Sequence, residues 1–167
     1  AVNGGVNLGG ATLNLTGSFV PSPGVAQSFV LVNNDAADAV VGTFAGLTEG
    51  ASITLNGVKL FITYQGGSGN DVVLNSQPVV NGTGGADTVT LIATPTGYTY
   101  QLNADPAVSV TGTTPFTFNG QAADDLLIVH PYYVLPMWHY YAQRVTPDPL
   151  PTPVTFNVLG QGDCMNQ

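Results

Sequence analysis

The sequence contains very little charge. Only 7% of its 167 residues are charged: ten acidic side chains, one lysine (Lys59) and one arginine (Arg144), which give a formal net charge of −8. Ordinary soluble domains carry roughly 25% charged residues. Nucleic acids and anionic membrane surfaces are bound by clusters of basic side chains, so this composition argues against both kinds of partner.

Cysteine and long apolar runs are also missing. Cys164 is the only cysteine, so no disulfide can form within the chain. With His130 and His139 it matches no common zinc spacing, and we expect surface or packing roles for all three. No run approaches the ~20 apolar residues of a membrane helix. The sequence begins with Ala-Val and no signal peptide, which we interpret as a mature or excised piece of a longer product.

The helix formers Lys, Glu, Arg and Met are scarce, whereas Val, Thr, Tyr and Phe are common, and this composition favours β-strands. Asn56-Gly57 lies between two β-rich runs and predicts an antiparallel hairpin. A second hairpin is predicted with Pro95 and Gly97 in its turn. The sequence therefore predicts an all-β fold, mainly of antiparallel, β-sandwich-like repeats. A parallel β-helix or solenoid is the alternative, because its coils also carry Gly/Asn turns at intervals.

An internal repeat is visible in the turns. Four segments share a frame of an amide residue, five mostly small residues and an aspartate, which is Asp71, Asp87, Asp125 or Asp163. The last three aspartates are spaced 38 residues apart, so residues 81–118 align with 119–156 without a gap. Repeats of this kind usually stack on their neighbours. We expect an N-terminal β unit over residues 1–75, followed over 76–167 by these two repeats and a truncated third.

Residues 40–74, VVGTFAGLTEGASITLNGVKLFITYQGGSGNDVVL, contain a further pattern. This stretch resembles a segment of large repetitive bacterial surface and autotransporter-like passenger proteins, with the form GTFxGLxEG…ISYxGGxGNDVVL. Looser similarity covers roughly residues 5–130, and residues 131–153 depart from the pattern because they are richer in Tyr and Pro. The resemblance implies an extracellular, β-rich stalk or passenger segment, and it supplies no catalytic residues.

Residues Gly66–Leu74 match the nonapeptide G-G-x-G-x-D-x-U-x, which binds calcium when it is stacked in repeat-in-toxin proteins. The turn that ends at Asp87 follows 16 residues later, close to one coil, but lacks the first Gly pair. The turn that ends at Asp125 keeps a single glycine, and 38 residues is the wrong step for such a stack. We therefore interpret these segments as Gly/Asn turns whose aspartates cap their own backbone amides. If a metal binds, calcium on Asp71 and Asp87 is the hypothesis; otherwise we expect no cofactor.

No pattern in the sequence indicates an enzyme. The adjacent acids Asp124 and Asp125 would point to opposite faces of a strand and would not converge on one substrate. There is no nucleophile elbow and no phosphate loop. An aromatic group is better explained as a protein–protein interface than as a sugar-binding platform. Its members are Tyr132, Tyr133, Trp138, Tyr140 and Tyr141.

Two functions from different classes fit these observations. The first is a structural extracellular protein: a subunit or segment of a bacterial surface fibre, filament or stalk, which assembles into a homopolymer through poorly guarded strand edges. In that case residues Val6–Phe19 would supply a strand to a neighbouring copy. The alternative is a calcium- or carbohydrate-binding module of a secreted protein. Two glycosylation sequons, at Asn14 and Asn81, are compatible with either.

Overall fold

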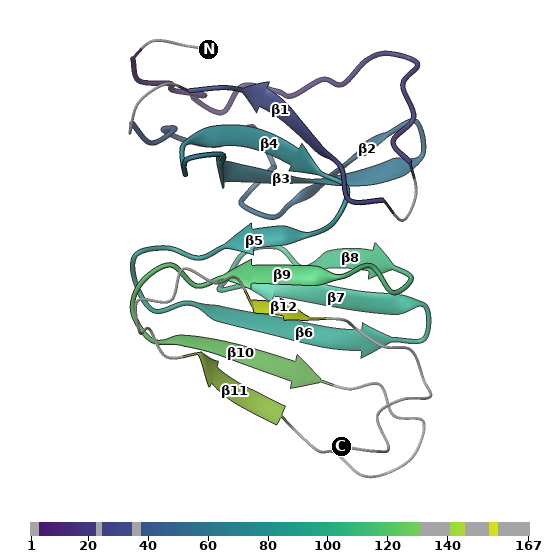
Figure 1. The fold of residues 1–167 in the computed structure, drawn as a ribbon, viewed down its shortest axis with the longest axis vertical. Coiled ribbons are helices and arrows are strands. Elements are labelled where there is room, and N and C mark those ends of the chain that lie inside the picture. The colour runs from purple at the N-terminus through teal and green to yellow at the C-terminus, as the bar shows by residue number, and fades with distance from the viewer. Residues whose placement is uncertain (1–3, 23–24, 35–37, 131–140, 146–153, 157–167) are drawn as a thin grey trace. The chain divides into compact units, whose positions relative to one another are not determined.

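The computed structural model describes residues 4–22, 25–34 and 38–130, and the backbone of 141–145 and 154–156. All regular elements in these ranges are β-strands (Figure 1). The chain divides into two compact units, Ala1–Asn81 and Gly82–Gln167. The all-β prediction is confirmed, with mainly antiparallel pairing. The described residues do not form the solenoid that was considered as the alternative.

The first unit is built on one antiparallel sheet with the strand order β1-β4-β3-β2. These strands are β1 (Ser28–Val32), β2 (Ser52–Leu55), β3 (Val58–Gly66) and β4 (Asp71–Asn75), and the short β5 (Val79–Asn81) follows them. The predicted hairpin joins β2 to β3, with Leu55 opposite Val58. Asn56 and Gly57 both have positive φ, 47° and 83°, as a two-residue turn of this kind requires.

One hydrophobic cluster of the first unit lies on one face of this sheet, and Phe61 and Val73 are buried on the other. Alternate residues of β3 and β4 point into this cluster, as the two-residue period of a strand dictates. They are Leu60, Ile62, Tyr64, Val72 and Leu74. Among the side chains that pack on this cluster are Leu8, Leu13 and Leu15 from the N-terminal segment.

The N-terminal segment differs from its prediction. TLNLTGSFV was expected to be a strand, but residues 11–20 form none. Their alternating leucines, Leu13 and Leu15, are instead partly buried and pack against the core of the same unit. Isolated hydrogen bonds hold the backbone of this segment. The amide of Leu8 donates to the carbonyl of Val41 at 3.0 Å, and the amide of Ala45 donates to the carbonyl of Ala11 at 3.0 Å. Alternating apolar residues indicate that one side of a segment is buried, and such burial does not require hydrogen bonding to a neighbouring strand.

The second unit contains the sheet β11-β10-β6-β7-β8. Its strands are β6 (Thr88–Thr94), β7 (Gly97–Leu102), β8 (Val108–Thr111), β10 (Asp125–His130) and β11 (Tyr141–Val145). The second predicted hairpin joins β6 to β7, with Thr94 opposite Gly97. A further antiparallel pair is formed by β9 (Phe116–Asn119) and β12 (Val154–Phe156).

The parallel pairing of β6 with β10 follows the sequence repeat. Thr88 lies opposite Leu126 and Ile92 opposite His130, so each residue is paired with the one 38 positions away. The repeat period is therefore also the register of this pair. Fully buried apolar side chains surround it in the same unit, including Val89, Leu127 and, from the neighbouring strands, Tyr98 and Phe116.

Candidate functional site

The glycine-rich nonapeptide forms the turn of an antiparallel hairpin. It joins β3 to β4, with Gly66 opposite Asp71. Gly67 and Gly69 have positive φ, 59° and 100°, and the amide of Gly69 donates to the carbonyl of Gly66 at 2.8 Å. In a calcium-binding stack this motif turns the chain between parallel coils. Here it reverses the chain between two neighbouring strands of one sheet.

The Asp71 carboxylate is directed into this turn. Its Oδ1 accepts a hydrogen bond from the Asn34 amide at 2.9 Å. Its Oδ2 lies against Gly67, where any Cβ would overlap it. Glycine is therefore required at position 67 both for its positive φ and for the space that the carboxylate fills. The bond to Asn34 ties the hairpin to the end of β1.

Asp87 and Asp125 occupy equivalent turns in the second unit, and both are almost fully buried, at 2% and 4% exposed. Asp87 accepts hydrogen bonds from the Thr83 amide at 2.6 Å and from Asn103 Nδ2 at 2.6 Å. The Asp87 amide donates to Asp125 Oδ1 at 3.0 Å. Burial raises the pKa of Asp125, and the negative charge of Asp87 acts in the same direction, while the bond from the Asp87 amide lowers it.

The two residues of the calcium hypothesis, Asp71 and Asp87, belong to different units, and each already accepts hydrogen bonds from its own unit. Within the described ranges no three His, Cys, Asp or Glu side chains group as metal ligands would. Calcium binding therefore stays a prediction. The neighbouring Asp124 is exposed whereas Asp125 is buried, so the pair does not present a joint acidic site.

The other residues singled out in the sequence are only partly described. His130 ends β10. Tyr141 begins β11, but its side chain is not described. Tyr132, Tyr133, Trp138 and Tyr140 lie outside the described residues, as do His139, Cys164 and Asp163. The predicted aromatic interface therefore stays a prediction.

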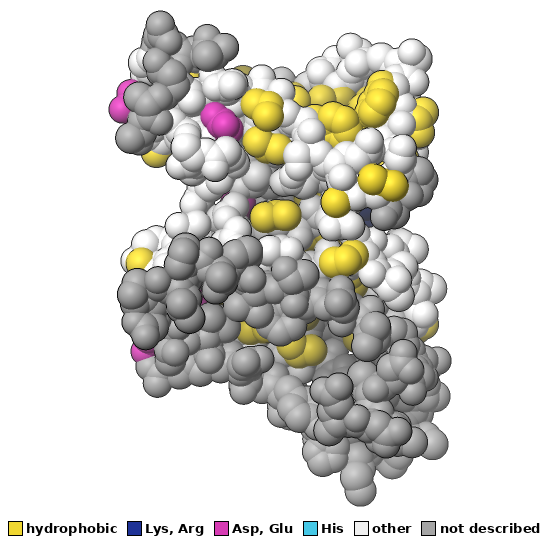
Figure 2. All heavy atoms as spheres, in the orientation of Figure 1, with side chains coloured by type: hydrophobic (Ala, Val, Ile, Leu, Met, Phe, Trp, Pro, Cys, Tyr) yellow, Lys and Arg dark blue, Asp and Glu magenta, His cyan; other side chains and the backbone are white. Residues whose placement is uncertain are grey.

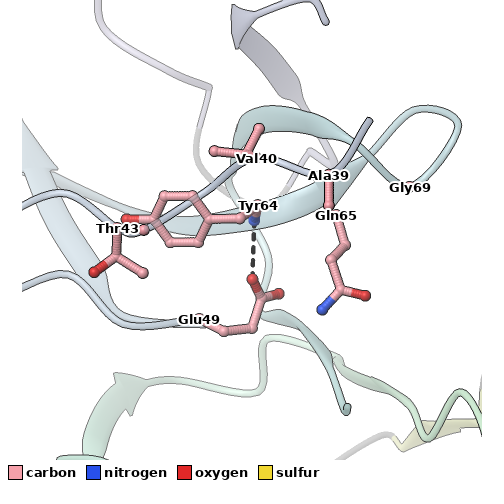
Figure 3. Close-up of a pocket in the computed structure, with 8 residues that line it drawn as sticks. Ala39, Val40, Thr43, Glu49, Tyr64, Gln65 and Gly69 are labelled. Atoms are coloured by element: carbon pink, nitrogen blue, oxygen red, sulfur yellow. Dashed lines mark hydrogen bonds between the residues drawn. The ribbon is translucent and has the colours of Figure 1, made fainter. Parts of the chain in front are cut away.

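A second polar centre surrounds Glu49, the only glutamate of the chain. Its Oε2 accepts a hydrogen bond from the Tyr64 amide at 2.9 Å (Figure 3). Its Oε1 accepts from both the amide and Nδ2 of Asn81, at 3.2 and 3.1 Å. Asn81 Nδ2 also donates to Thr63 Oγ1 at 2.8 Å. The carboxylate thus joins the central strand β3 to the short strand β5 within the first unit.

Glu49 and Tyr64 line a shallow depression of about 410 Å³, together with residues of the segment 39–43. Burial raises the pKa of Glu49, although its hydrogen bonds to Tyr64, Thr63 and Asn81 act in the opposite direction. The Tyr64 hydroxyl is also engaged: it donates to the carbonyl of Leu47 at 2.7 Å and accepts from the amide of Phe44 at 3.0 Å. The Glu49 carboxylate and the Tyr64 hydroxyl therefore both stabilise the fold of the first unit.

Sequence reasoning did not single out Glu49 or Asn34. The partner Asn81 lies 32 residues from Glu49, and Asn34 lies 37 residues from Asp71, so no local pattern connects them. A weak signal was present for Glu49: a lone glutamate between Thr48 and Gly50, in a chain almost without charge, is unusual for a solvent-exposed turn.

Comparison with known proteins returned no match: no family model, no curated protein and no solved structure is similar to this chain. A helix long and apolar enough to cross a membrane is likewise not found among the described residues.

Proposed function

We propose that this chain is a structural extracellular protein, a segment of a bacterial surface fibre or stalk that self-associates through β-strand edges. The observation that carries the proposal is the chemistry of its edge strands. In the first unit the sheet ends at β1 and β2, with the sequences SFVLV and SITL. Neither strand contains a charge or a proline.

Monomeric β proteins usually protect such edges with lysine, proline or bulges. The only lysine, Lys59, lies on β3, which is internal to its sheet, so it guards neither edge. In the second unit the edge strand β8 has the sequence VSVT and is also uncharged. The one protective feature on β1 is an irregular register between Val30 and Val32. An edge of this kind is a ready site for pairing with another strand.

Exposed apolar side chains accompany β1. Val30 is 56% exposed on the strand itself. The exposed Phe19 packs edge-on against Phe29 of β1, with ring centroids 5.5 Å apart. Hydrophobic side chains are visible on the surface of the first unit among side chains that are mostly uncharged (Figure 2). Burial of such groups adds to the backbone hydrogen bonds that a new strand would form.

The N-terminal segment Val6–Phe19 is not proposed as the strand that one copy donates to the next. Leu8, Leu13 and Leu15 pack on the core of their own unit, and deleting the segment would expose that core. The strands left to pair between copies are the edge strands themselves. Pairing of β1 in one copy with a different edge strand in the next is heterologous, and it extends into a filament when the rotation does not close.

The test is sedimentation velocity on the full chain over a wide concentration range, with two matched variants. Val30→Lys places a charge on the edge strand. Ile92→Lys places the same charge at a position 46% exposed on β6, which is internal to its sheet. We expect the parent chain and Ile92→Lys to form large species, and Val30→Lys to dissociate. A parent chain that stays monomeric at high concentration would refute the proposal, and equal loss of assembly in both variants would refute the role of the β1 edge.

A further inference from the structure

The sequence contains two N-x-[ST] sequons, and their surroundings differ. Asn14-Leu15-Thr16 lies on the N-terminal segment, which has no regular secondary structure. Leu13 and Leu15 pack against the core of the first unit, whereas Asn14 and Thr16 are exposed. The amide and the hydroxyl that define the sequon therefore both face outward. Among the described residues, Asn14 has no hydrogen-bond partner.

The second sequon, Asn81-Gly82-Thr83, is built into the fold. Asn81 is 5% exposed, and its Nδ2 donates to Glu49 at 3.1 Å and to Thr63 at 2.8 Å. Attachment of a sugar to Nδ2 would remove one of these two donors and would require space that the unit does not leave. The Thr83 hydroxyl is also occupied, since it lies 3.1 Å from Asp87 Oδ2. A glycan on Asn81 and the folded state of the first unit are mutually exclusive.

We infer that Asn14 is an N-glycosylation acceptor of this chain and that Asn81 is not. The co-substrate is an oligosaccharide carried on a polyprenyl diphosphate. Asn14 Nδ2 attacks its anomeric carbon: the new C–N bond forms, and the bond from that carbon to the diphosphate oxygen breaks. The lipid diphosphate leaves with the electron pair, and the proton lost by the amide passes to this diphosphate. N-linked glycans occur on exposed loops of secreted proteins, and Asn14 meets this requirement. The inference rests on the extracellular setting of the proposed function, but not on a bacterial source or on self-association; the eukaryotic cell used below supplies the oligosaccharide and its transferase.

The two basic residues allow the sequons to be separated. Trypsin cleaves after lysine and arginine, so cleavage at Lys59 and Arg144 leaves Asn14 in the fragment 1–59 and Asn81 in the fragment 60–144. The full chain would be secreted from a eukaryotic cell, treated with a peptide-N-glycosidase in H₂¹⁸O and digested. Release of a glycan converts its asparagine to ¹⁸O-labelled aspartate, which mass spectrometry detects. Asn-Gly pairs occur in both fragments and also take up ¹⁸O by spontaneous deamidation, so the label is located by fragment ions and compared with a control incubated without the glycosidase. We expect glycosidase-dependent label at Asn14 only.

The matched variants are Thr16→Ser, which keeps the hydroxyl of the sequon, and Thr16→Ala, which removes it at an exposed position. We expect the label to persist in the first and to disappear in the second, with secretion unchanged in both. Absence of glycosidase-dependent label at Asn14, in cells whose own secreted proteins are labelled, would overturn the inference. Glycosidase-dependent label at Asn81 of the secreted, folded chain would overturn it too. Sedimentation of unglycosylated protein tests the proposed function separately.

Discussion

Replacement of Glu49 by alanine tests the role of the buried carboxylate in the first unit. The change leaves three N–H donors without their acceptor: the Tyr64 amide, the Asn81 amide and one bond of Asn81 Nδ2. Each buried donor that loses its partner costs ~1–3 kcal/mol. The adjoining depression admits water to the site, so we take the lower end for each donor, which gives a loss of about 3 kcal/mol. That is a large part of the ~5–15 kcal/mol by which domains are usually stable.

The assay is urea unfolding followed by circular dichroism. With a slope of about 2 kcal/mol per molar urea, a loss of 3 kcal/mol lowers the unfolding midpoint by ~1.5 M. Thr43→Ala is the control, because Thr43 is exposed and lines the same depression. A surface change of this kind usually alters stability by less than about 0.5 kcal/mol. A loss of stability below about 1 kcal/mol for Glu49→Ala would refute the proposed role of the carboxylate, as would an equal loss in Thr43→Ala.

Three further predictions follow from the same contacts. Burial raises the pKa of Glu49 and of Asp125, so the folded state binds these two protons more tightly than the unfolded state does. The free energy of unfolding should therefore fall as the pH rises from the ordinary pKa values of 4.5 and 3.8 through the raised pKa values of the folded state. Urea unfolding midpoints measured from about pH 4 to about pH 7, the range above the ordinary carboxyl pKa values, check this trend. In the double variant Glu49→Gln, Asp125→Asn the midpoint should depend less on pH. Asn56→Ala removes two hydrogen bonds from Asn56 Nδ2 to the carbonyls of Gly17 and Phe19, at 3.0 and 2.7 Å, and places alanine at positive φ. We expect a loss of ~1–3 kcal/mol by the same assay, and no loss would contradict the assigned turn. Chelation of calcium should leave the far-ultraviolet β signal unchanged, because Asp71 and Asp87 are satisfied by amides of their own units, and unfolding in chelator would make them metal ligands.

The predictable parts of the fold are those fixed by neighbouring residues. Asn56 and Gly57 both accept positive φ, and this local preference alone sets the β2–β3 register. The 38-residue spacing of the turns equals the β6–β10 register. What sequence reasoning missed depends on contacts between distant residues. The alternation of Leu13 and Leu15 was consistent with a strand, but these side chains are satisfied by packing without a ladder.

The aspartates that end the glycine-rich turns illustrate how one motif supports two kinds of structure. In both units a turn aspartate accepts an amide from a preceding turn or strand end: Asp71 from Asn34 and Asp125 from Asp87. The two sequence separations, 37 and 38 residues, are nearly equal. One glycine near the start of each turn is also explained, because Gly67 and Gly120 lie where the oxygen of Asp71 or Asp125 leaves no room for a Cβ.

Each of these carboxylates accepts a hydrogen bond from a backbone N–H. Its negative charge is compensated by N–H donors of the backbone, which are the partners that lower the cost of burying it. In a calcium site the same oxygens would be ligands of the ion. Asp125 Oδ1 is held by the Asp87 amide at 3.0 Å, and calcium on Asp71 and Asp87 stays a hypothesis. Hydrogen bonds thus connect each of these two turn aspartates to a segment 37 or 38 residues earlier in the chain.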